Sequence, residues 1–188
     1  IYKQGQQKQK KAEVEKALVD VLAFELLPVS RQSIQDASRY VDRLYARNNT
    51  DIERALTTGL DILAVSEERE AAKVVVFLTD GLPTAGVTDE SLIAQSVRRA
   101  NEGVGASIHV FGVGYDVNTH LLDQLAAENH GTVVYVEPGQ SLERALTEFY
   151  GQIAHPLLTG VEIAFEGMEV SEVYPQQVPD LFVGSSLV

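Results

Sequence analysis

Two polar residues, one after a predicted strand and one before a predicted helix, have side chains that can bind a cation. Asp80 directly follows the apolar run 73–79 (KVVVFLT), and Thr50 directly precedes a helical pattern that starts at Asp51. In an open parallel sheet, ligands bind outside the carboxyl ends of the strands, where loops and helix N-termini converge. A hydroxyl and a carboxylate are hard oxygen ligands, which Mg²⁺ or Mn²⁺ takes while keeping several waters. Thr50 and Asp80 therefore predict part of a divalent-cation site.

Each of these residues also has a structural interpretation. Asp80 and Gly81 can simply form a turn. The stretch Thr50-Asp51-Ile52-Glu53 fits a capping box, in which the Thr50 hydroxyl accepts a backbone N–H and Glu53 reaches back. Asp116 follows another apolar run and could line the same crevice, although a turn role is the simpler interpretation. Ligand and structural roles stay open for all three residues.

The sequence contains no motif for a zinc site, a nucleotide-binding loop or a catalytic nucleophile. There is no cysteine, and the four histidines lack zinc-ligand spacing, so we expect no zinc site. We expect His109, inside an apolar run, to be a core or interface residue. Gly103-Val104-Gly105 follows a predicted helix and lacks a third glycine, so it is no dinucleotide loop. With no P-loop, no G-x-S-x-G and no nucleophile beside an evident base, we expect no enzyme.

Composition and charge narrow the class of protein further. The 188 residues are 45% hydrophobic and 22% charged, as in ordinary soluble domains. The net charge of −12 argues against a nucleic-acid partner, which needs a clustered basic face. No apolar run reaches the roughly 20 residues that span a bilayer, so no membrane insertion is expected.

Apolar runs alternate with helical periodicity along most of the chain. This order, with short Gly- and Asp-rich turns, predicts an α/β fold with a doubly wound, mostly parallel sheet and helices on both faces. The predicted strands are 18–24, 73–79, 107–113 and 132–136. The predicted helices are a short one ending near Ala17, then 33–46, 51–65, 91–101, one opened by Asn118 and stopped by Gly131, and 142–153.

The pattern of apolar and polar residues changes after His155-Pro156. The remaining stretch alternates at period two and contains Pro175 and Pro179 without a helical pattern. We therefore expect one domain over residues 1–155 and the start of a β-rich region over 156–188.

Several segments resemble a known family. VVVFLTDGLPTAGVTDESLI, with NNTDIERAL before it and SIHVFGVGYDVNTHLLDQLAAENHGTVVYVE after it, is similar to von Willebrand factor type A domains of the inter-alpha-trypsin inhibitor heavy chain kind. The similarity continues through FYGQIAHPLLTGVEIAF into YPQQVPDLFVG and covers nearly everything after residue 18. The resemblance implies a Rossmann-like sheet and a metal-ion-dependent adhesion site, or MIDAS.

The resemblance also implies a ligand set for that site. The family takes D-x-S-x-S from its first strand, a Thr from a later loop and an Asp from a T-D-G-like turn. Thr50 matches that Thr and Asp80 matches that Asp, whereas D-x-S-x-S is absent and Ser30-Arg31-Gln32-Ser33 does not replace it. Three of the five expected protein ligands are therefore missing.

The missing motif has a consequence for folding. In the family the first strand lies in the sheet between the strands predicted here at 18–24 and 73–79. Without it the sheet would have unpaired edges, which invite self-association. We expect that the chain is truncated upstream of Ile1, and the alternative is a divergent domain whose N-terminal segment replaces that strand.

The resulting functional hypothesis is a binding module. A divalent cation, Mg²⁺ or Mn²⁺, would keep an open coordination position that an acidic side chain of a partner protein fills, in a secreted or cell-surface protein. The first alternative is a structural domain that binds no metal and acts as a spacer. A further alternative is a doubly wound enzyme with a nucleotide or phosphate ligand, against which stands the absence of a phosphate-binding loop.

Overall fold

The structure is a computed structural model that describes residues 26–43, 49–66, 71–153, 156–158, 167 and 181–182. The chain forms two compact units, Ile1–Arg47 and Asn48–Val188. The first contains helix α2 (Arg31–Val41) within its described part. The second contains these elements in chain order: α3 (Ile52–Ala64), β1 (Val74–Thr79), α4 (Glu90–Asn101), β2 (Ser107–Val113), α5 (Thr119–Ala127), β3 (Val133–Val136), α6 (Leu142–Ile153), β4 (Pro156–Leu158) and β5 (Leu181–Phe182).

Helix α2 of the first unit begins with a complete capping box. The Ser30 side chain accepts the N–H of Ser33, and the Ser33 hydroxyl accepts the N–H of Ser30 at 2.8 Å. This pair satisfies two N–H groups that a helix start leaves without partners, so the helix starts two residues before the predicted 33–46. Its apolar residues Ile34 and Val41 are exposed.

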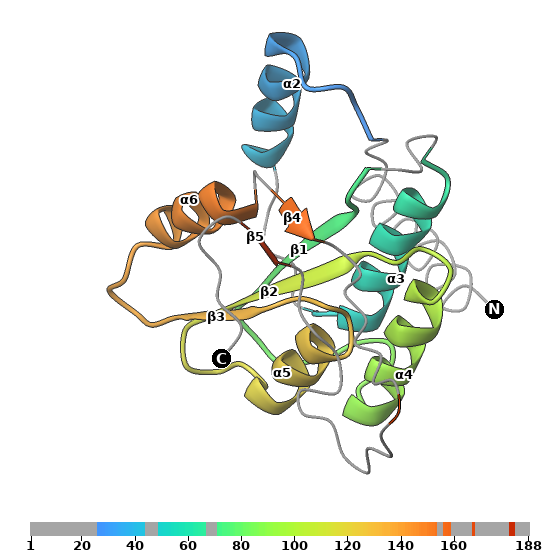
Figure 1. Cartoon of the computed structure of the whole chain (residues 1–188). Coiled ribbons are helices and arrows are strands. Elements are labelled where there is room, and N and C mark those ends of the chain that lie inside the picture. Colours follow the sequence, from blue (N-terminus) through green and yellow to red (C-terminus); the bar gives the residue numbers. More distant parts are fainter. Residues whose placement is uncertain are drawn as a thin grey trace, which may run out of the picture. The chain divides into compact units, whose positions relative to one another are not determined.

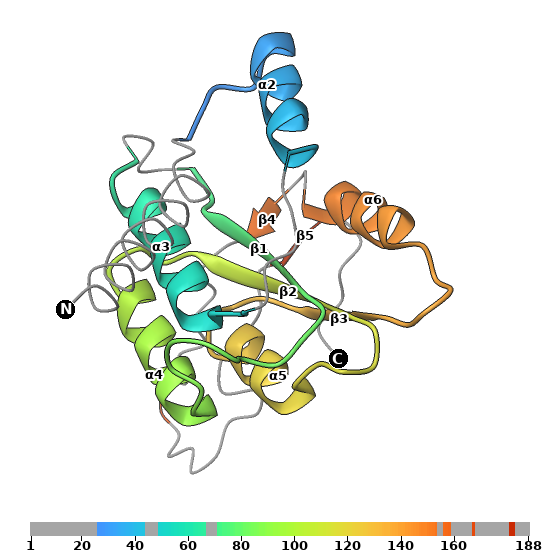
Figure 2. The same ribbon diagram turned by 180° about the vertical axis from the view of Figure 1, so that it is seen from behind.

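The second unit is built on a parallel sheet in the order β1-β2-β3. Val74 pairs with Ser107 at one end of the β1–β2 ladder and Thr79 with Gly112 at the other. All three strands run in the same direction, so their carboxyl ends share one edge, as the α/β prediction requires. Figures 1 and 2 show α3, α4 and α5 on one face of this sheet and α6 on the other, and the predicted doubly wound arrangement is confirmed.

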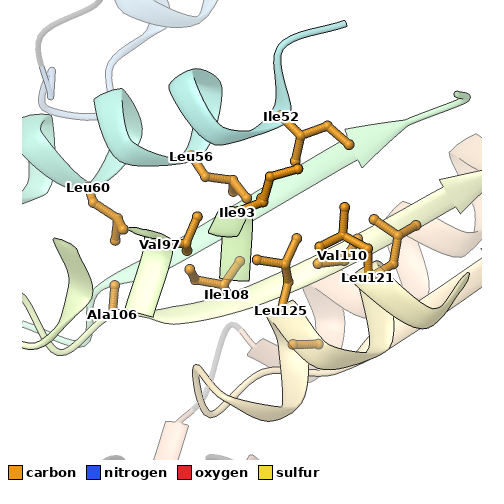
Figure 3. Close-up of a cluster of buried hydrophobic side chains, with 12 residues drawn as sticks. Ile52, Leu56, Leu60, Ile93, Val97, Ala106, Ile108, Val110, Leu121 and Leu125 are labelled. Atoms are coloured by element: carbon orange, nitrogen blue, oxygen red, sulfur yellow. The ribbon is translucent and has the colours of Figure 1, made fainter. Parts of the chain in front are cut away.

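The face covered by α3, α4 and α5 forms the main core. Apolar residues at helical spacing on the three helices meet alternate residues of β2 (Figure 3). Each fully buried Leu or Ile stabilises the fold by about 1.5–3 kcal/mol. The cluster comprises Ile52, Leu56, Leu60, Ile93, Val97, Ala106, Ile108, Val110, Leu121, Leu122, Leu125 and Ala126.

The opposite face carries a smaller cluster under α6. Phe149 of α6 packs edge-on against Phe111 of β2, with ring centroids 5.2 Å apart. His109 lies beside it, 4.8 Å from the Phe149 ring and with its Nδ1 3.0 Å from Thr132 Oγ1, so the prediction of a core histidine is confirmed. On β1 this face is less covered: Val76 and Leu78 are 39% and 43% exposed.

Two asparagines form a buried network at the amino edge of the sheet, where α4 and α5 end. Asn101 donates to the Ala106 carbonyl at 2.7 Å and accepts the Ala106 N–H at 2.8 Å. It also donates to the Asn129 side chain at 2.9 Å, and Asn129 donates to Leu125 O at 2.7 Å. The ends of both helices are thereby tied to the start of β2.

The chain enters β3 through a tight approach at Gly131. His130, not Gly131, adopts the left-handed conformation that ends α5, with φ of 55°. A Cβ on Gly131 would overlap the Ile108 carbonyl. Gly131 is therefore needed for the close approach of two backbones, which is a different reason from the helix stop that the sequence predicts.

Most predicted elements agree with the structure within two residues at each end. The strand 107–113 and the helix 142–153 have the predicted bounds, whereas α2 ends at Val41 and α5 at Ala127, both earlier than predicted. The helix predicted to end near Ala17 and the strand predicted at 18–24 lie outside the described residues. In the stretch predicted to be β-rich, β4 pairs with β5 in an antiparallel ladder.

Candidate functional site

The site begins with Thr50, which the structure places just before α3. The predicted capping box is wrong: the cap of α3 is Asp51, whose Oδ1 accepts the Arg54 N–H at 3.1 Å. Asp and Thr are both good cap residues, and the structure uses the second of two adjacent candidates. The Thr50 hydroxyl makes no hydrogen bond with the described residues, so it is available to a ligand.

The loop after β1 is anchored on the residues before α3. The Thr50 carbonyl accepts the N–H groups of Thr84 at 2.9 Å and Ala85 at 3.1 Å. In return, the Thr50 N–H donates to Thr84 Oγ1 at 2.8 Å. Gly86 then crosses the Asp51 carboxylate so closely that a Cβ would overlap it, and its φ of 64° also favours glycine.

Asp80 lies at the start of this loop, at the carboxyl edge of the sheet. The preceding Thr79 is buried, and its hydroxyl bonds both the carbonyl and the N–H of Gly81, at 3.3 and 3.4 Å. The position that a Gly81 Cβ would take is 4.0 Å from Thr50 Oγ1. The structure thus brings Thr50 next to the Asp80-Gly81 turn, across 30 residues of sequence. Both predicted interpretations of Asp80, turn residue and ligand, fit this place.

Other polar residues of the same edge have different surroundings. Asp116 is exposed in the segment after β2 and makes no hydrogen bond with the described part of the chain. Glu90, at the start of α4, accepts Asn118 Nδ2 at 2.7 Å and lies 3.1 Å from His120 Nδ1. Glu90 and His120 therefore tie the first turns of α4 and α5 together and are not free for a ligand.

The cap of α4 closes the loop at its far end. Asp89 accepts the Ser91 hydroxyl at 2.6 Å and the Leu92 N–H at 3.0 Å. These hydrogen bonds, first that of Ser91, lower the pKa of the Asp89 carboxyl below its usual value. Asp89 is thus an ionised cap and serves the helix.

The donors at this edge determine which cation would fit. Thr50 Oγ1 and the Asp80 carboxylate are hard oxygens without hydrogen-bond partners among the described residues. Mg²⁺ commonly binds through one or two carboxylates and keeps several waters, so this donor chemistry suits it. However, no group of three or more His, Cys, Asp or Glu within the described ranges could hold a metal ion. The two donors fit a hydrated cation and form no closed cage.

Sequence reasoning missed three residues that shape this edge. The capping role of Asp51 was missed because its neighbour Thr50 fits the same capping pattern. Thr84 bonds Thr50 across 34 residues, and no local pattern predicts such a contact. Gly86 had a weak signal, since a glycine in a loop often marks a left-handed turn or a close approach.

Comparison with known proteins decides the family. The family model of the von Willebrand factor type A domain matches residues 22–148, which is more than half of the chain. The chain belongs to the von Willebrand factor type A family. A solved structure, the von Willebrand factor type A from Catenulispora acidiphila, has the same fold with a TM-score of 0.60. It is 24% identical in sequence and covers 68% of this chain and 29% of its own.

Curated relatives of this type A domain are inter-alpha-trypsin inhibitor heavy chains, which confirms the resemblance found in the sequence. Heavy chain 4 of Mus musculus is 30% identical over 170 residues, and heavy chain H4 of Homo sapiens is 30% identical over 168. Heavy chain H4 of Sus scrofa is 34% identical over 166 residues. These matches cover 85–87% of this chain and 18% of each relative, so the chain spans about a fifth of their length. No helix among the described residues is long and apolar enough to cross a membrane.

Proposed function

We propose that this type A domain is a protein-binding module that depends on a divalent cation, Mg²⁺ or Mn²⁺, held at the carboxyl edge of the sheet. Thr50 would ligate the cation directly, and Asp80 directly or through a water. An acidic side chain of a partner protein would fill an open coordination position. The module makes and breaks no covalent bond, and we place it in a secreted or cell-surface protein.

One observation carries the proposal. The cap of α3 is Asp51, the Thr50 hydroxyl makes no hydrogen bond with the described residues, and it lies beside the turn that holds Asp80. Had Thr50 been the cap, its oxygen would be occupied by a backbone N–H. Two hard oxygens on adjacent loops, neither bonded to a described residue, are the donors that a hydrated Mg²⁺ takes.

The proposed module has a boundary near residue 156. The family match ends at residue 148, and α6 ends at Ile153, before the chain enters β4. We propose that residues 1–155 form the type A domain and that 156–188 begin a β-rich region.

A second function is favoured by one observation. Within the described ranges, no set of three or more His, Cys, Asp or Glu could hold a metal ion, and the sequence has no D-x-S-x-S. A type A domain with so few ligands could act as a metal-free spacer. The spacer and the cation-dependent module differ in whether the cation stabilises the fold.

A thermal melt with and without 10 mM Mg²⁺ or Mn²⁺ separates the two functions. A ligand that binds only the folded state raises its stability, by about 1.4 kcal/mol at ten times the dissociation constant. For a domain of this size that corresponds to a rise in Tm of about 4 °C. We expect this rise in the wild type and its loss in Asp80→Ala and Thr50→Val.

The matched control is Asp116→Ala, which removes an exposed carboxylate of the same edge. It should keep the rise, since Asp116 is not beside Thr50 in the described contacts. A wild-type Tm that does not respond to either cation would reject the cation-dependent module and leave the spacer.

A further inference from the structure

The loop that carries Asp80 is held at two places. Near β1, the Thr79 hydroxyl bonds both polar backbone groups of Gly81. Further along, Thr84 and Ala85 bond the backbone of Thr50. Asp80 lies within the Thr79–Gly81 turn that the first anchor holds, and the second anchor holds Thr50 beside that turn. Together the two anchors hold Asp80 and Thr50 near each other.

Thr84 makes the second anchor reciprocal. Its N–H donates to Thr50 O at 2.9 Å, and its Oγ1 accepts the Thr50 N–H at 2.8 Å. Thr50 precedes the cap of α3, so its N–H lies outside the helical ladder and needs another acceptor. The Thr84 side chain supplies this acceptor. Thr84 is exposed and is not part of the hydrophobic core.

The geometry points to Thr84 as a positioning residue for the cation site: its hydroxyl fixes Thr50 beside the Asp80 turn without ligating the cation. This inference rests on the proposed function. The Thr84 hydroxyl already accepts the Thr50 N–H, whereas the Thr50 hydroxyl is free among the described contacts. Residues that orient metal ligands change metal affinity by about 10- to 100-fold when they are lost.

Two variants of the full chain test the role of Thr84. Thr84→Val keeps the β-branched shape and removes the acceptor, and Thr84→Ser keeps the acceptor. Two quantities are measured: the hydrogen-exchange rate of the Thr50 amide without metal, by NMR, and the affinity for Mn²⁺, by electron paramagnetic resonance. Exchange reports the anchor itself, and Mn²⁺ affinity reports its effect on the site.

We expect Thr84→Val to exchange the Thr50 amide about tenfold faster and to bind Mn²⁺ about tenfold more weakly, with Thr84→Ser close to wild type. Equal Mn²⁺ affinity in wild type and Thr84→Val would overturn the inference and leave the proposed function standing. Equal weakening by valine and serine would overturn it too, since the hydroxyl would then not matter. A wild type that binds no Mn²⁺ would reject the proposed function and the inference together.

Discussion

At the amino edge of the sheet, two asparagine side chains are buried and bonded to each other, whereas at the carboxyl edge the aspartates that follow β1 and β2 are exposed. Asn101 and Asn129 are only 6% and 1% exposed, and their amides bond each other and neighbouring backbone groups. Asp80 and Asp116, at the other edge, are exposed and make no hydrogen bond with the described residues. The two edges therefore use polar residues for different purposes.

The difference follows from the cost of burying polar groups. A buried amide must keep its hydrogen bonds, because an unsatisfied one costs about 1–3 kcal/mol. An exposed carboxylate can exchange water for a ligand at little cost to the fold. We infer that substitution of the buried amides at the amino edge lowers stability. Substitution of the exposed Asp80 at the carboxyl edge should leave stability nearly unchanged and weaken cation binding.

The largest expected effect is that of Gly131→Ala at the amino edge. The added methyl group would overlap the Ile108 carbonyl, so β2 and the start of β3 must move apart. We expect a loss of about 3 kcal/mol in the free energy of unfolding, measured by urea denaturation. The control is Gly103→Ala, where a Cβ meets nothing within 4 Å. Equal stability of the two variants would show that the amino edge is looser than the contacts indicate.

A similar loss is expected for Asn101→Ala, which tests the hydrogen bonds of that edge. The substitution leaves both polar backbone groups of buried Ala106 without their Asn101 partner. We expect a loss of about 2–3 kcal/mol in the free energy of unfolding. Gln95→Ala, at an exposed position of the same helix, should change it by less than about 0.5 kcal/mol. A loss below about 1 kcal/mol at Asn101 would mean that water replaces the amide there, and the contrast between the edges would weaken.

The same contrast explains what the sequence could predict. Strand 107–113 and helix 142–153 were predicted with the observed bounds, because each has a local apolar pattern: a continuous buried run in the strand and a single apolar face in the helix. The cap of α3 was assigned to Thr50 instead of Asp51, since both residue types stabilise helix N-termini and only the backbone decides between them.

Contacts between distant residues could not be predicted in this way. The bonds between Thr84 and Thr50, and the approach of Gly131 to Ile108, join residues that share no local pattern. Thr50 and Asp80 were predicted to share one edge because strand ends and helix starts meet there in parallel sheets. Their adjacency depends on the path of the loop between β1 and α4, which the sequence does not reveal.

The smallest expected effect on stability is that of Asp80→Ala at the carboxyl edge. The carboxylate has no hydrogen-bond partner among the described residues, so its loss should change the free energy of unfolding by less than about 0.5 kcal/mol in EDTA. The same variant should lose the rise in Tm that the cation gives the wild type. If Asp80→Ala instead destabilises the metal-free chain by about 2 kcal/mol, Asp80 is a structural turn residue. The carboxyl edge would then use this aspartate for stability, as the amino edge uses its asparagines, and the contrast between the two edges would be wrong.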